Sequence, residues 1–119
     1  MKIQKNKLAS IIIVNFNNAK LLNQSLDSAL NQSYKFKEII VVDDYSTDNS
    51  LQVLKKFKNK IKLIKNKKKT LQGSFNQINS YYKGFLKTKG EYIFFLDSDD
   101  FYNKNKIKIL IEEFQLNNS

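Results

Sequence analysis

The stretch EIIVVDDYSTDNS, residues Glu38–Ser50, passes directly from a strand pattern to a helix pattern. It opens with an apolar, β-branched run, which predicts a strand over Lys37–Val42 that is buried on both faces. The Ser-Thr-Asp triplet further along contains residue types that commonly begin helices, so a helix is predicted after it. Asp43 and Asp44 lie between the two elements, at the carboxyl end of the predicted strand.

The same alternation continues on both sides of this stretch. The other predicted strands are Leu8–Val14, Ile61–Ile64 and Glu91–Leu96, and the other predicted helices are Ala19–Gln32, Gln72–Lys87 and Lys104–Leu116. Alternating strands and helices predict an α/β fold, Rossmann-like, with a mostly parallel sheet and helices on both faces. In such sheets, ligands bind beyond the carboxyl ends of the strands.

The third predicted helix has an apolar pattern and an unexpected glycine. Its apolar residues recur at helical spacing and are expected on one face, namely Phe75, Ile78, Tyr82 and Phe85/Leu86. Gly84 lies inside this helix at a cost of about 1 kcal/mol relative to alanine. Gly90 is expected to end it.

The composition excludes several kinds of chemistry. The 119 residues fit one domain and include no Cys and no His, and every basic residue is a lysine. Disulfides, thiolate zinc sites, Cys nucleophiles and His general bases are therefore impossible within this sequence. A bound metal would need oxygen ligands, which favours magnesium, manganese or calcium.

The formal net charge of +10 has two interpretations. It fits a polyanionic partner such as nucleic acid, or a solvated lysine surface. The lysines are spread along the sequence, which favours the solvated surface. We therefore expect no nucleic-acid partner.

Aspartates follow two of the predicted strands. Six of the 11 acidic residues lie there: Asp43, Asp44, Asp48, Asp97, Asp99 and Asp100. If the strand continued past Leu96, Asp97 and Asp99 would leave the same face of the sheet. One or two carboxylates on one face suit a divalent cation whose other ligands are water and phosphate oxygens. The pattern predicts a metal-bound diphosphate at this edge.

Three motifs in this order resemble family 2 glycosyltransferases with the GT-A fold: SIIIVNFN, EIIVVDDYSTDNS and KGEYIFFLDSDDFY. The resemblance covers about Leu8–Phe114 and concerns the N-terminal, nucleotide-sugar-binding half of the family. It implies that Asn15 and Phe16 lie against the base, and that Asp44 hydrogen-bonds it. Asp43 then supports the loop of the same nucleotide site.

The third motif matches the DxD sequence of the family. The resemblance implies that Asp97 reaches the ribose or a metal-bound water, and that Asp99, with Asp97 beside it, binds manganese or magnesium. This sequence departs from the family at Tyr45, where glycine is usual. It also has Ser80-Tyr81-Tyr82 in place of an Ala-Arg-Asn stretch.

The resemblance implies metal-assisted, inverting transfer of a sugar from a nucleotide-diphosphate sugar, with UDP as the expected nucleotide. The expected acceptor is a glycan or a lipid-linked saccharide. Family members continue into an acceptor-binding half with the general base, and no residue here matches that base. We expect residues 1–119 to be one truncated donor-binding domain without a catalytic residue and without activity of its own. The expected location is the cytoplasm, with peripheral association at the inner membrane face left open.

Two other functions compete with this one. The stretch FFLDSDD also resembles the nucleophile motif of haloacid-dehalogenase phosphohydrolases, with Asp97 as nucleophile and Asp99 as acid/base. That motif normally opens a chain, and it leaves VDDYSTDNS unexplained. The third alternative is a non-catalytic, basic nucleic-acid-binding module, although the strand-end edge is acidic.

Overall fold

The computed structural model describes residues 7–67 and 74–117. In these ranges the strands are β1 (Ala9–Asn15), β2 (Lys37–Asp43), β3 (Lys62–Lys65) and β4 (Tyr92–Asp97). The helices are α1 (Ala19–Leu30), α2 (Ser50–Lys55), α3 (Ser74–Phe85) and α4 (Lys106–Asn117). None of these helices is long and apolar enough to cross a membrane.

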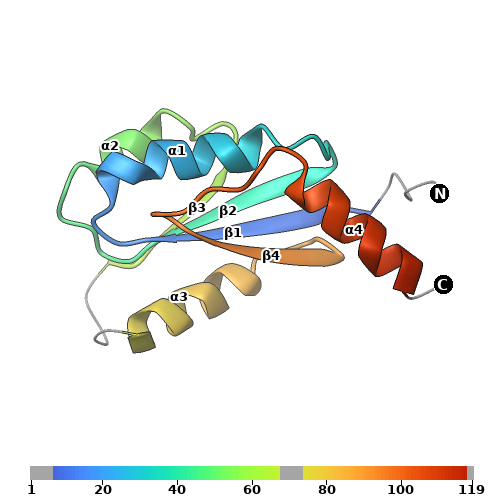
Figure 1. Ribbon diagram of the computed structural model, residues 1–119. Coiled ribbons are helices and arrows are strands. Elements are labelled where there is room, and N and C mark those ends of the chain that lie inside the picture. The colour runs from blue at the N-terminus through green and yellow to red at the C-terminus, as the bar shows by residue number, and fades with distance from the viewer. Residues whose placement is uncertain (1–6, 68–73, 118–119) are drawn as a thin grey trace.

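The strands form one parallel sheet in the order β3-β2-β1-β4. Helices α1, α2 and α4 cover one face, and α3 covers the other (Figure 1). The predicted α/β fold, with a parallel sheet and helices on both faces, is confirmed. Each predicted strand matches an observed one to within a residue at either end.

The absence of polar alternation in β1 has a direct structural cause. Ile11 and Ile13 enter the larger core beneath α1, α2 and α4. Ile12 and Val14 enter a smaller core beneath α3. Because both faces of this strand are covered, every residue of β1 is buried.

The apolar residues predicted for one face of α3 do not pack on the sheet. Ile78, Tyr82, Phe85 and Leu86 are 65, 58, 48 and 59% exposed, and the Phe75 side chain lies outside the described part. Ser80 is instead fully buried, and a Cβ at Gly84 would lie 2.6 Å from Ile12 Cγ2. Small residues one turn apart let α3 approach the sheet closely, and this turns its larger apolar residues outward.

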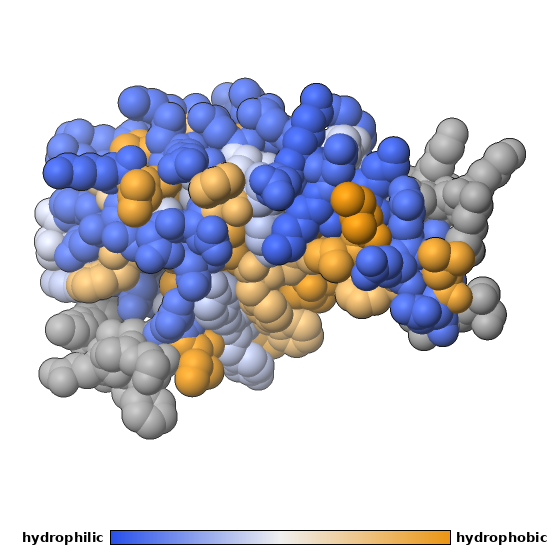
Figure 2. All heavy atoms as spheres, viewed as in Figure 1, coloured by the Kyte–Doolittle hydropathy of each residue, from blue (hydrophilic) through white to orange (hydrophobic). Residues whose placement is uncertain are grey.

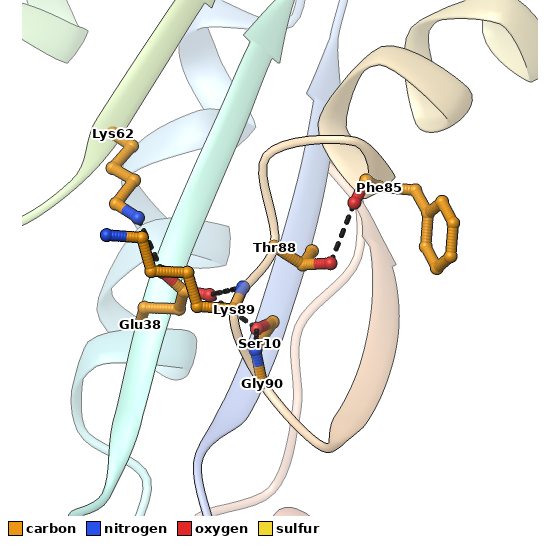
Figure 3. A network of polar contacts seen from close by, with 7 residues as sticks. All are labelled: Ser10, Glu38, Lys62, Phe85, Thr88, Lys89 and Gly90. Carbon is orange, nitrogen blue, oxygen red and sulfur yellow. Dashed lines mark hydrogen bonds and ion pairs between the residues drawn. The ribbon is translucent and has the colours of Figure 1, made fainter.

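The loop between α3 and β4 is tied to the amino ends of β1 and β2 (Figure 3). Glu38 accepts hydrogen bonds from Ser10 Oγ (2.6 Å), from the Lys89 backbone N–H (2.6 Å) and from Lys62 Nζ (2.8 Å). Burial alone would raise the pKa of Glu38, but these bonds hold it below its usual value. Gly90 N–H donates to Ser10 Oγ (2.9 Å). These contacts fix where β4 begins, at the end of the sheet opposite the carboxyl ends of the strands.

The close approach of α3 predicts the effect of Gly84→Ala. Alanine is the better helix former, but its Cβ would overlap Ile12 Cγ2. We expect a net loss of about 1–3 kcal/mol in the free energy of unfolding, as for other overpacked cores. Ile78→Ala, on the exposed face of the same helix, should stay within about 0.5 kcal/mol. Urea denaturation of both variants measures the difference, and equal stabilities would contradict the packing described here.

Candidate functional site at the carboxyl edge of the sheet

Parallel register brings the motif residues to one edge. Asn15, the last residue of β1, pairs with Asp43 on β2, and Val14 pairs with Asp97 on β4. The ladder continues just past the strands, because the Asp44 N–H donates to Asn15 O (2.8 Å) and the Ser98 N–H donates to Val14 O (3.2 Å). The two aspartate-rich stretches therefore lie at the same edge, with β1 between them.

Asp43 is buried and satisfied by its own surroundings. It is 2% exposed and accepts hydrogen bonds from Asn15 Nδ2 (2.9 Å), Ser46 Oγ (2.7 Å) and Ser46 N–H (3.0 Å). Asn15 is fully buried, and its Oδ1 has no hydrogen-bond partner among the described residues. Both side chains hold the loop after β2 in place through their hydrogen bonds with Ser46. Their contact with a nucleotide stays a prediction.

Asp44, the next residue, is half-buried at the same edge. Its Oδ1 accepts a hydrogen bond from Asn66 Nδ2 (2.9 Å). Asn66 in turn accepts one from Lys83 Nζ (2.7 Å) and donates one to Ser80 Oγ (3.2 Å), so it joins Asp44 to α3. Sequence reasoning missed Asn66, although its place two residues after the third predicted strand was the available signal.

Two aromatic rings are exposed at the same edge. Phe16 is 50% exposed directly after β1, and Tyr45 is 44% exposed after β2. The backbone of Tyr45 has a φ of 58°, in the left-handed region that bulky residues rarely adopt. The bonds from Asp43 to Ser46, on either side of Tyr45, hold the loop in this shape.

Asp48 accepts hydrogen bonds from backbone N–H groups at the starts of two helices. Its Oδ2 accepts a hydrogen bond from the Ala19 N–H (3.0 Å) at the start of α1, and its Oδ1 accepts one from the Ser50 N–H (2.9 Å) at the start of α2. Burial would raise the pKa of Asp48, but these bonds and the one from the Ser50 hydroxyl lower it. Asp48 therefore joins the starts of two helices and is not part of the cluster after β4.

The strand does not continue between Asp97 and Asp99. β4 ends at Asp97, and a turn follows in which the Asp100 N–H donates to Asp97 O (3.0 Å). Asp97 and Asp99 are therefore not related by strand pleating, because a turn sets the direction of Asp99. Asp99 is exposed, and no hydrogen bond holds its carboxylate within the described ranges.

Asp97 is held by α3. Its Oδ1 accepts hydrogen bonds from Gln77 Nε2 (2.9 Å) and from the Tyr81 hydroxyl. Burial, and then the Asp97 carboxylate, raise the pKa of Tyr81, so this hydroxyl stays protonated and remains a donor. A hollow of ≈ 490 Å³ lies here, lined by residues of α3 and β4 and by Asp100.

The donor set does not form a complete cage for a metal. No group of three or more acidic side chains converges on one point in the described part of the chain. Asp97 and Asp99 could supply one or two carboxylate ligands, and the remaining ligands would come from water and phosphate. This fits Mg²⁺ or Mn²⁺ bound together with a nucleotide, since such ions keep few protein ligands.

Comparison with known proteins decides the family. Residues 10–119 match the family described as Glycosyl transferase family 2. The chain belongs to this family. Family 2 membership disfavours the phosphohydrolase alternative, which explained only the stretch after β4.

Two bacterial relatives have known activities in their names. A Staphylococcus aureus poly(ribitol-phosphate) beta-N-acetylglucosaminyltransferase, TarP, is 36% identical over 95% of this chain and 35% of its own length. An Escherichia coli UDP-Glc:alpha-D-GlcNAc-diphosphoundecaprenol beta-1,3-glucosyltransferase, WfaP, is 39% identical over 85% and 39%. This family 2 chain therefore spans little more than a third of the length of either relative.

A solved structure shares the fold. The S. aureus TarS structure, residues 1–349 in complex with UDP-GlcNAc, superposes with a TM-score of 0.75 at 28% identity. The match covers 91% of this family 2 chain and 31% of the TarS chain. The sheet and its helices thus correspond to a GT-A glycosyltransferase.

The burial of Asp43 leads to a stability prediction. Asp43→Ala removes the acceptor for Asn15 Nδ2 and for both Ser46 donors, so we expect a loss of about 1–3 kcal/mol in the free energy of unfolding. Asp99→Ala is the control, because that side chain is exposed and should leave stability unchanged. Thermal unfolding of both variants checks this, and a neutral Asp43→Ala would remove the supporting role of Asp43.

Proposed function

We propose that the chain is the donor-binding part of a glycosyltransferase and binds a nucleotide-diphosphate sugar, with UDP as the nucleotide. The observation that carries this proposal is the placement of Asp44 and of Asp97–Asp99 at one edge of the sheet, on either side of β1. The UDP-sugars in the names of WfaP and of the TarS complex support the choice of nucleotide.

The proposed contacts divide between base and diphosphate. Asp44 accepts a hydrogen bond from the base with the oxygen that Asn66 leaves open. The exposed ring of Phe16 lies against the base, while Asn15 and Asp43 form the floor of this side of the site. An acceptor beside an exposed aromatic ring suits a flat ring that carries an N–H group.

The proposed diphosphate side uses the cluster after β4. Asp99 is a metal ligand, and Asp97 binds the ribose or completes the metal site through a water. When bound, Mn²⁺ or Mg²⁺ neutralises charge on the departing nucleoside diphosphate. Within the described ranges the exposed carboxylate of Asp99 accepts no hydrogen bond. This supports the assignment, because a carboxylate already saturated with hydrogen bonds would be a poorer ligand.

The proposed reaction is inverting sugar transfer to a glycan or lipid-linked acceptor. The names of TarP and WfaP include a poly(ribitol-phosphate) and a diphosphoundecaprenol-linked sugar, which supports an acceptor of this kind. The residues described here bind and orient the donor. The general base that takes the proton of the acceptor hydroxyl belongs, on this proposal, to a further part of a longer protein.

Calorimetry with UDP tests the nucleotide site. We expect tighter binding with Mn²⁺ than with a chelator, because a cation offsets the repulsion between diphosphate and carboxylates. Asp99→Asn should remove most of this difference and weaken metal-dependent binding about tenfold or more. Asp44→Asn should weaken binding about tenfold both with and without metal, since its partner is the base.

Asp27→Asn is the matched control for these variants, because Asp27 lies on the exposed side of α1. Equal affinity for UDP with Mn²⁺ and with a chelator would overturn the metal assignment. Unchanged affinity in Asp44→Asn would overturn the base contact.

The 119-residue chain alone should show no measurable sugar transfer. Acid–base help is worth about 10²–10⁴ in rate, and on this proposal the general base lies outside the residues described here. Figure 2 shows apolar side chains along the exposed edge of β4, where Phe95 is 54% exposed, so self-association is also expected. An assay over several UDP-sugars and acceptors, with light scattering, checks both. Robust turnover by a monomer would contradict them.

A further inference from the structure

Helix α3 reaches from the middle of the sheet to the end of β4. Gly84, near its carboxyl end, lies against Ile12 of β1 and Val42 of β2. Gln77 and Tyr81, nearer its amino end, lie one turn apart and therefore project from the same side of the helix. Both donate a hydrogen bond to Oδ1 of Asp97, so one helix face holds one carboxylate oxygen.

The Tyr81 ring is itself held in place. It meets the Phe95 ring of β4 edge-on, with the ring centroids 5.1 Å apart and the planes at 86°. The ring also packs against the smaller core around Ile12. An edge-to-face pair is a favoured aromatic geometry, and burial leaves the ring little freedom. The hydroxyl is therefore aimed at Asp97 before any ligand binds.

Two donors on Oδ1 leave Oδ2 as the oxygen that a ligand can reach. Neither donor carries a charge, so the negative charge of Asp97 remains available to a cation or to sugar hydroxyls. A fixed carboxylate binds with less loss of side-chain entropy than a free one. This arrangement orients Asp97 without neutralising it.

We propose that Tyr81 and Gln77 are positioning residues that hold Asp97 in the orientation needed to bind the nucleotide and its metal. The inference rests on the function proposed above and adds α3 to the donor site. The Asp97 carboxylate stays exposed beside a hollow of ≈ 490 Å³, whereas a contact that served only to close the core would be buried. Gln77 is also exposed, so its bond does not complete the core.

The test compares two neighbouring tyrosines. Tyr81→Phe removes only the hydroxyl and keeps the ring against Phe95. We expect UDP affinity in the presence of Mn²⁺ to fall about tenfold, the effect of one hydrogen bond to a charged group. Tyr82→Phe is the matched control, because Tyr82 is 58% exposed and its hydroxyl has no partner among the described residues. Gln77→Ala should lower the affinity a few-fold by the same route.

A double variant separates positioning from general stability. If Tyr81 acts through Asp97, Tyr81→Phe should cause no further loss of UDP affinity in an Asp97→Asn background. Mn²⁺ binding followed by electron paramagnetic resonance gives a second measurement that needs no enzyme activity. Thermal unfolding shows whether each variant is folded. If Tyr81→Phe does not fold, Gln77→Ala provides the test, because Gln77 is exposed.

The outcomes are distinguishable. Wild-type protein that binds UDP, with Tyr81→Phe and Gln77→Ala as tight as wild type, would overturn the positioning role and leave the proposed function standing. An equal loss from Tyr81→Phe in the wild-type and Asp97→Asn backgrounds would also overturn it. Wild-type protein that does not bind UDP would overturn the proposed function, and the role of Tyr81 with it.

Discussion

The parallel pairing of β1 with β2 on one side and β4 on the other brings the two aspartate-rich stretches to one edge of the sheet. It sets Asn15 beside Asp43 and Val14 beside Asp97, so stretches far apart in sequence end at one edge. The apolar side chains of β1 make this pairing favourable, because both faces of the strand are buried. The loops that follow these strands start from fixed backbone positions. The first aspartate of each loop is therefore also held at a defined place.

The aspartates that follow β2 and β4 have different physical roles at this edge. Asp43 is buried and accepts three hydrogen bonds, and Asp48 bonds to the starts of two helices, so both stabilise the scaffold. Asp99 is exposed and unpaired within the described part, which leaves its charge for a ligand. A carboxylate that is satisfied internally supports a site, and one that is not can bind there.

Helix α3 connects the two sides of the site. Through Ser80 and Lys83 it bonds to Asn66, which donates to Asp44, and through Gln77 and Tyr81 it bonds to Asp97. The close packing of α3 on the sheet depends on its small residues Ser80 and Gly84. A shift of this helix would therefore disturb the proposed base contact and the proposed diphosphate contact together.

The α/β class, the strands to within a residue at either end, and the two aspartate stretches at the strand ends could all be predicted from the amino-acid sequence. These are local properties, because an apolar run indicates a buried strand and turn residues indicate where it ends, and both are read within one segment of the sequence. Three features required the three-dimensional structure: Gly84 rather than Ile78 faces the sheet, a turn separates Asp97 from Asp99, and Asn66 and Tyr81 reach the aspartates. Helical periodicity gives the spacing of side chains but not the neighbour that each face meets. That neighbour is set by strand order and by how closely a helix can approach, and both depend on residues distant in sequence.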